Sequence, residues 1–189
     1  MEKTSIDHPL VQFLNNSGEL IGNPVNQSSR QIKDLAGVFA NEKARENMDA
    51  EQLVYEVQLY LPVQEGTEGG LFFGNTTIYP GRVDQEYFMT KGHFHAIRDR
   101  GEYYWCIEGE GVLILMDENR NTWGEKMTPG SLHYIPGKIA HRVANTGANH
   151  LRFGACWPSD AGHDYDTIAS HGFGARLLAI DQVPTLVKY

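Results

Sequence analysis

Three histidines and one glutamate stand at spacings that can bring them to a single metal ion. His93 and His95 alternate in one extended run, and alternate residues of a strand point to the same face. Residues 99–101 are typical of a turn, so Glu102 would begin the next strand close to both histidines. His141 follows a Pro-Gly turn in a second strand-like segment. Together these four side chains predict a metal centre.

The donor set indicates the kind of ion. Neutral imidazole with one carboxylate suits Fe, Mn, Ni, Zn or Co, and no sulfur ligand is implied. Structural zinc sites usually close their coordination with thiolates, so we expect a centre that keeps open positions for a ligand. A lone histidine has many other uses, but four donors at matched spacing favour a metal, given strands to carry them.

The elements that position these donors are predicted to be short strands. From residue 52 onward the hydrophobic pattern has a period of two, interrupted by Gly and Pro, which is typical of a β-sandwich or barrel. The predicted strands are 53–60, 71–73, 75–79, 87–95, 103–107, 112–116, 122–127, 132–135, 141–145 and 151–157. Helical spacing of apolar residues predicts short helices over 30–39, 42–48 and 164–173.

Composition limits the classes of partner and compartment. A chain of 189 residues, 41% hydrophobic and 21% charged, is ordinary for one soluble domain with extensions. The net charge of −8 argues against a nucleic-acid partner, and a phosphate-bearing ligand would need local cations. No apolar run approaches a membrane span of ~20 residues, and no signal peptide is visible, so we expect a cytoplasmic protein. Cys106 and Cys156 lack CxxC spacing and are expected to be reduced.

The ligand run resembles the two sequence motifs of the cupin family. The first motif is matched by His93, His95, Glu102 and Gly109, with a longer gap before Glu102 and Tyr87 where a glycine usually stands. The second is matched throughout by Gly130, Pro136, His141 and Asn145. This resemblance implies an all-β fold, a double-stranded β-helix or jelly-roll barrel, with short N-terminal and C-terminal helices.

A closer resemblance is to the cupin-type glucose-6-phosphate isomerases of archaea and some bacteria. It rests mainly on Thr90–His95, Glu102-x-Tyr104 and Pro158–Ala169, and covers roughly residues 50–175. It implies an N-terminal extension over residues 1–50, a cupin barrel over 51–160 and a C-terminal helix and tail over 161–189, all within one domain. It also implies a homodimer.

The resemblance assigns roles residue by residue. The metal ligands carry over onto His93, His95, Glu102 and His141, with Fe²⁺ the favoured ion and Mn²⁺, Ni²⁺, Zn²⁺ or Co²⁺ as alternatives. Glu102 and Tyr104 take the catalytic roles. Substrate binding carries over onto Tyr55, Thr76, Thr90, Gly92, His163 and Tyr165, with Lys91 as an alternative cation for the phosphate. Two positions depart from the family: Lys138 stands where an aromatic residue is frequent, and Trp157 where a tyrosine is common.

The implied reaction moves hydrogen between C1 and C2 of a phosphorylated sugar. Either a base takes the C2 proton to give a cis-enediol, or a hydride moves directly; a divalent metal can act as Lewis acid in both. Glu102 is the natural base, and Tyr104, two residues along the strand, would face the same side and relay protons.

Two other classes of protein share the motif. A cupin dioxygenase also uses three histidines and one glutamate, but its pocket should be apolar and needs no phosphate donors. A non-enzymatic sugar-binding cupin often loses metal ligands, whereas this chain keeps all four. Turnover of fructose 6-phosphate with and without added metal separates the three.

Overall fold

Strands form most of the protein in the computed structural model, which describes residues 7–188. They are β1 (Val11–Phe13), β2 (Leu20–Gly22), β3 (Asn26–Gln31), β4 (Leu53–Tyr60), β5 (Leu71–Ile78), β6 (Arg82–Val83), β7 (Glu86–Tyr87), β8 (Glu102–Glu108), β9 (Gly111–Met116), β10 (Thr122–Met127), β11 (Leu132–Ile135), β12 (Ala140–Asn145), β13 (Leu151–Pro158), β14 (Ala175–Ile180) and β15 (Val183–Lys188). The helical elements are short: a 3₁₀ turn, η1 (Ile32–Leu35), and the helices α1 (Glu42–Glu46) and α2 (Asp166–His171). Within the described residues, no helix is long and apolar enough to cross a membrane.

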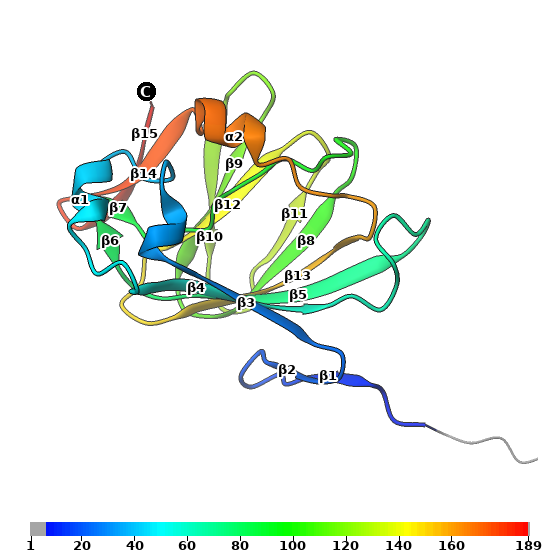
Figure 1. Cartoon of the computed structure of the whole chain (residues 1–189). Helices are drawn as coiled ribbons and strands as arrows, with labels where there is room; N and C mark the ends of the chain where they lie inside the picture. Colours follow the sequence, from blue (N-terminus) through cyan, green and yellow to red (C-terminus); the bar gives the residue numbers. More distant parts are fainter. Residues whose placement is uncertain (1–6, 189) are drawn as a thin grey trace, which may run out of the picture.

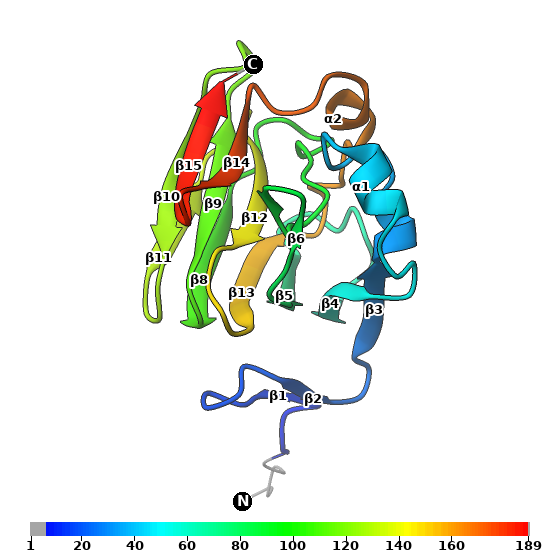
Figure 2. The ribbon, with the colours of Figure 1, turned by 90° about the vertical axis from the view of Figure 1, so that its left-hand side faces the viewer.

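The strands pair antiparallel in four sheets. The largest has the order β11-β8-β13-β5-β4-β3, and a second has the order β10-β9-β12. Two smaller sheets follow the orders β15-β14-β7-β6 and β1-β2. Figures 1 and 2 show α2 and the β1–β2 hairpin at opposite ends of the molecule. The predicted all-β cupin barrel, a jelly roll with short helices toward each end of the chain, is confirmed.

One hydrophobic core joins side chains from both main sheets. Val54 and Ile78 of the six-stranded sheet and Leu113 and Val143 of the three-stranded sheet are completely buried within the same cluster. Strand β9 is buried along nearly its whole length, which explains its unbroken apolar run. This packing holds the strands that carry the functional side chains at fixed positions.

The N-terminal hairpin lies against the outer face of the six-stranded sheet. The ring of Phe13 contacts those of Phe73 and Trp105, at centroid distances of 5.6 and 6.3 Å. The Leu20 amide donates to Gln58 Oε1 over 3.0 Å, and the Asn75 side chain donates to the Gly18 carbonyl. Residues that the sequence marks only as polar and turn-rich are therefore tied to the barrel.

Most predicted strands are confirmed to within a residue or two. The segments 71–73 and 75–79 are in fact one strand, β5, which runs through Gly74. A Cβ at Gly74 would lie 3.1 Å from the side chains of Leu59 and Trp157, so the glycine fits a tight contact here and does not end the strand. Both cysteines are free, with Cys106 buried and Cys156 half-buried.

The helix predicted over residues 30–39 is wrong. Strand β3 continues through Gln31 because it pairs with β4, with Arg30 opposite Tyr55, and only the single turn η1 follows. Ile32 and Leu35 are buried as their helical spacing indicated, but edge pairing overrides that local preference. The next predicted helix is confirmed as α1, which begins after Asn41; the side chain of Asn41 accepts a hydrogen bond from the Ala44 amide.

The strand predicted over residues 87–95 is interrupted. Regular pairing ends at Tyr87, and Gly92 adopts φ +71°, in the left-handed region that suits glycine. Beyond Tyr87, isolated bridges pair Met89 with Ala144 and His93 with His141. The ligand segment is thus extended and fixed by single bridges, where a continuous ladder was predicted.

The hairpin β14–β15 follows α2 and was not predicted. Its burial alternates, with Ala175, Leu177 and Ala179 facing inward. Asp181 and Gln182 form its two-residue turn, and both have positive φ, as in a type I′ turn. The turn was not predicted because Asp-Gln lacks the glycine that usually marks such turns.

Candidate metal centre and adjoining cavity

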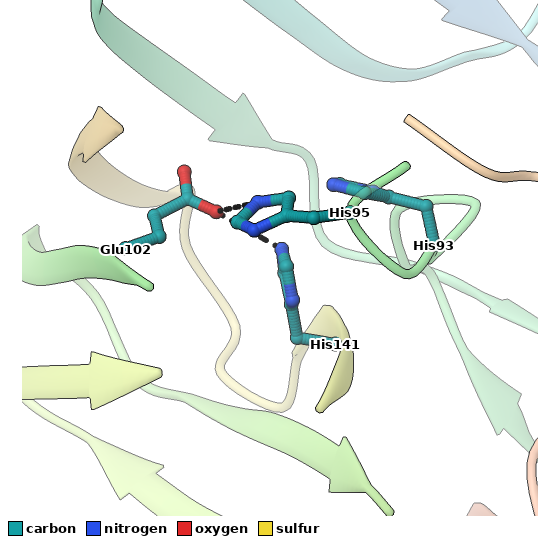
Figure 3. A group of neighbouring side chains, drawn as sticks. All are labelled: His93, His95, Glu102 and His141. Atoms are coloured by element: carbon teal, nitrogen blue, oxygen red, sulfur yellow. Dashed lines mark hydrogen bonds and ion pairs between the residues drawn. The ribbon is translucent and has the colours of Figure 1, made fainter. Parts of the chain in front are cut away.

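The four predicted ligands meet inside the barrel. One ligand atom from each lies within 4.8 Å of those of the others, and Figure 3 shows the four side chains gathered together. His93 and His95 come from the segment between β7 and β8, Glu102 is the first residue of β8, and His141 lies on β12. The residues that sequence spacing singled out are therefore brought together from three parts of the fold.

Main-chain hydrogen bonds join two of these parts directly. The His93 amide donates to the His141 carbonyl over 3.2 Å, and the His141 amide donates back to the His93 carbonyl over 3.0 Å. Three residues earlier, the Thr90 amide donates to the Val143 carbonyl over 2.9 Å. The ligand-bearing segment is therefore paired with β12 on both sides of Gly92.

Backbone carbonyls orient two of the imidazoles. His95 Nδ1 lies 2.8 Å from the Arg100 carbonyl, and His141 Nδ1 lies 3.2 Å from the Ile139 carbonyl. When Nδ1 donates in each ring, each Nε2 atom keeps a free lone pair. The Nε2 atoms of His95 and His141 lie 3.3 Å and 3.0 Å from Glu102 Oε2. This is the tautomer in which Nε2 can bind a metal.

Two buried nitrogens of the centre lack hydrogen-bond partners. These are His93 Nε2 and His141 Nε2, the latter because its close approach to Glu102 lacks hydrogen-bond geometry. A buried polar atom without a partner is costly, and a bound cation removes that cost. Three imidazole nitrogens and one carboxylate converging on one point fit a divalent transition-metal ion.

At His93 and Glu102 the electrostatics favour the forms that bind metal. Burial, together with the neighbouring imidazoles of His141, His163 and His95, holds the pKa of His93 well below its ordinary value, so that ring is neutral. Burial raises the pKa of Glu102, but the contacts from His141 and His95 outweigh it and leave the pKa below its ordinary value. The carboxylate is therefore ionised at neutral pH.

A cavity of about 230 Å³ opens beside the centre. Its walls include the ligands His93, Glu102 and His141 but not His95. All the residues predicted to bind substrate, and the second catalytic residue, line this cavity: Tyr55, Thr76, Thr90, Gly92, Tyr104, His163 and Tyr165. The structure thus brings the whole predicted set to one place.

The sequence matches a known family over most of its length. The family model for glucose-6-phosphate isomerase covers residues 29–188. The chain belongs to the glucose-6-phosphate isomerase family. Relatives named glucose-6-phosphate isomerase include those of Thermococcus litoralis, 43% identical over 86% of this chain and 85% of its own, and Pyrococcus horikoshii, 45% identical over 76% of each chain. That of Sinorhizobium medicae is 36% identical over 80% of this chain and 71% of its own.

Solved structures give a weaker likeness. Oxalate decarboxylase from Bacillus subtilis has a TM-score of 0.46 at 18% identity, over 58% of this chain and 26% of that one. A predicted oxalate decarboxylase from Thermotoga maritima has a TM-score of 0.41 at 21% identity, over 55% of this chain and 80% of that one. At these values, nothing about activity follows from the likeness.

Within this member of the isomerase family, the aromatic groups of the cavity are stacked against the centre. The ring of His163 lies 4.4 Å from that of His93, and Tyr165 stacks on His163 with an interplanar angle of 11°. Tyr104 approaches His141 edge-on at 5.6 Å. Burial, reinforced by the charge of Glu102, holds the pKa of Tyr104 well above 10, so its hydroxyl stays protonated.

One charged residue of the cavity was not predicted from the sequence. Arg30 lines the wall, at the point where β3 pairs with Tyr55, but the incorrect helix prediction placed it outside the barrel. Trp157, the departure from the family's tyrosine, also lines the cavity. Lys138 does not: it sits in a turn with φ +66°, its side chain is 57% exposed, and it pairs with Asp99 at 3.4 Å.

Proposed function

We propose that the protein interconverts glucose 6-phosphate and fructose 6-phosphate, the aldose–ketose isomerisation of glycolysis and gluconeogenesis. The observation that carries the proposal is the shared cavity. A three-histidine, one-carboxylate centre and a set of hydroxyl and cationic groups line the same space in a chain of the isomerase family. That polar lining disfavours the dioxygenase alternative, whose pocket should be apolar.

The metal ligands in this proposal are His93, His95, Glu102 and His141. When bound there, a divalent ion supplies Lewis acidity and an anchor for the sugar oxygens. We propose Fe²⁺ as the native ion, with Mn²⁺, Ni²⁺, Zn²⁺ and Co²⁺ as ions that the same nitrogen and oxygen donors accept. The neutral state of His93 supports this assignment, because a protonated imidazole cannot bind a metal.

Glu102 acts as the general base in the proposed reaction. Its ionised carboxylate takes the C2 proton of the open-chain aldose, the C–H electron pair forms the C1–C2 double bond, and O1 gains a proton from Tyr104. The enediol then takes the proton back from Glu102 at C1, while O2 returns a proton to Tyr104, and the ketose results. Both side chains point into the cavity from strand β8.

The phosphate is proposed to bind among the hydroxyl and cationic groups of the cavity. Thr90 Oγ1 already accepts a bond from the Val143 amide over 3.1 Å, so its proton remains for a phosphate oxygen. The other proposed groups are the Thr76 hydroxyl, the Gly92 amide, His163, Tyr165 and Tyr55. Lys91 and Arg30 line the same cavity and add the local positive charge that a chain of net charge −8 requires for a phosphate dianion.

Two further features of the proposal concern the setting of the enzyme. We propose a homodimer on the basis of the family resemblance, which light scattering on the purified protein can test. We propose the cytoplasm as its compartment, because both substrates are intracellular metabolites and the two cysteines are free.

The test is an assay of glucose 6-phosphate formation from fructose 6-phosphate, coupled to a dehydrogenase. Protein loaded with one equivalent of Fe²⁺ should turn over, chelated protein should be inactive, and added metal should restore activity. Loaded protein without interconversion in either direction would refute the proposal. Oxygen consumption with small organic acids, and sugar-phosphate binding without turnover, would then separate the dioxygenase from the binding protein.

A further inference from the structure

A second cavity, of about 430 Å³, adjoins the first, and the wall residues that it does not share with the first have no role in the proposed reaction. The two share five wall residues: Arg30, Tyr55, Lys91, Gly92 and Tyr165. The remaining walls come mainly from the segment after η1, from β7, β9 and β12, and from α2 through β14. This volume lies within the range of small-molecule sites.

A buried arginine lies in the wall of this cavity. Arg142 is only 7% exposed, and its guanidinium lies 4.2 Å above the ring of Phe173. It donates to the Lys91 carbonyl over 2.8 Å and contacts the Met89 sulfur at 3.2 Å, a poor acceptor. Its Nε has no partner among the described residues.

This guanidinium forms no ion pair in the described part of the chain. None of the ion pairs there includes Arg142. The guanidinium is a cation at neutral pH. A buried, unpaired cation is strongly unfavourable, and an anion in the cavity would relieve that cost.

The charges that belong to this cavity alone point the same way. Apart from the residues shared with the first cavity, two cationic side chains line it, Arg142 and Arg176, against one carboxylate, Glu86. That carboxylate is committed elsewhere, because it pairs with Arg176 at 2.8 Å and accepts from the Ala40 amide at 2.5 Å. A local surplus of positive charge in a chain of net charge −8 favours a small anion.

Other parts of the cavity wall are apolar. Ile114, Ile168, Phe173 and Leu177 contribute buried hydrophobic surface to its walls. A sugar phosphate, which is polar throughout, would leave these side chains against hydroxyl groups. A ligand with a charged end and a hydrophobic body would match both the charged and the apolar parts of the wall.

We propose that this cavity is a second binding site, separate from the sugar-phosphate site, for a small organic anion with an apolar or aromatic body. Its phosphate or carboxylate group pairs with Arg142, and its body packs along Phe173 and Leu177. Arg142 follows the metal ligand His141 and donates to Lys91, within the segment that carries His93.

The binding test uses phenyl phosphate as the probe, titrated calorimetrically into the full chain. Benzoate tests the carboxylate alternative with the same ring, and phenol shows what the ring contributes without a charge. We expect one equivalent of either anion, and much weaker binding of phenol. Since a hydrogen bond to a charged group is lost, Arg142→Met should weaken anion binding by about tenfold or more.

A second variant tests the cavity in case Arg142→Met does not fold. Ala36 is exposed and lines the cavity, so Ala36→Trp should fill its mouth and weaken phenyl phosphate by a similar factor while leaving Arg142 intact. Lys126→Met is the matched control, because it removes a cation that is 70% exposed on β10, away from the cavity, and should change nothing.

Two outcomes would overturn the proposal. One is that neither phenyl phosphate nor benzoate binds. The other is that Thr76→Ala, which alters only the first cavity, abolishes binding while Arg142→Met and Ala36→Trp retain it, which would put the anion in the sugar-phosphate site. Because the measurement uses no turnover, an inactive isomerase would leave this test unaffected.

Discussion

Replacing Glu102 by glutamine separates its two proposed roles, ligand and base. The side chain is 5% exposed and its Oε2 lies 3.3 Å from His95 Nε2 and 3.0 Å from His141 Nε2. An amide has nearly the same shape and keeps one oxygen that can face a metal, but it cannot accept a proton at neutral pH. The three imidazoles remain in place. We therefore expect metal content near that of the parent protein.

The loss of the base sets the size of the effect on turnover. General-base catalysis contributes roughly 10²- to 10⁴-fold, equivalent to about 2.7–5.4 kcal/mol of transition-state stabilisation. No nearby group replaces it, because burial and the carboxylate hold the pKa of Tyr104 well above 10 and its phenolate is scarce at neutral pH. The turnover number of Glu102→Gln should fall by that factor, while the substrate concentration at half-saturation changes little.

The assay measures metal by mass spectrometry and initial rates at saturating fructose 6-phosphate on the same sample. Glu108→Gln is the matched control, since it lies on the same strand with a side chain that is 55% exposed, and it should behave like the parent. If Glu102→Gln keeps its metal and turns over within about threefold of the parent, Glu102 is not the base. Direct hydride transfer between C1 and C2, which requires no base at carbon, would then be the better account.

Three further predictions test other parts of the site. The double variant His93→Ala, His95→Ala should lose stoichiometric metal and all turnover but remain folded by circular dichroism; metal retained at one equivalent would contradict the ligand assignment. Thr76→Ala should raise the half-saturating substrate concentration roughly ten- to a hundredfold, with metal unchanged, because a bond to a charged phosphate is lost. Asp164→Asn should lower thermal stability only above about pH 4. Hydrogen bonds from Thr167 hold the pKa of Asp164 below its ordinary 3.8 in the folded protein. The parent is therefore the more stable protein while this carboxylate is ionised, and it loses that advantage as the pH falls and the carboxylate takes up a proton. A stability gap that persists at pH 2 would contradict it.

The metal ligands could be predicted from sequence because their geometry is local. Alternation places His93 beside His95, a turn returns the chain at Glu102, and a second motif supplies His141. Each step depends only on the period of a strand or the length of a turn. The structure keeps this arrangement even though the strand predicted to carry the histidines is reduced to isolated bridges.

Features that depend on distant pairing could not be predicted in this way. Arg30 enters the cavity because β3 adds to the edge of the six-stranded sheet, and nothing in residues 26–35 distinguishes that outcome from a helix. The burial of Arg142 also could not be predicted from the sequence. Its place in β12 was predicted, but its burial against Phe173 depends on a segment that joins the barrel only after α2.

The double hydrogen bond between His93 and His141 has a consequence for how the protein acquires its ion in the cell. Two ligands are held by main-chain pairing, and two imidazoles are oriented by the carbonyls of Arg100 and Ile139, so hydrogen bonds of the fold itself hold the donors in place. Binding energy is then not spent on folding, and even weakly held ions can load. Nitrogen and oxygen donors alone rank divalent ions by their intrinsic affinity, with copper and zinc above iron and manganese. Which ion fills the centre is therefore decided by the free concentration of each metal where the chain folds, so the same polypeptide made under different metal supply should emerge as different metalloforms.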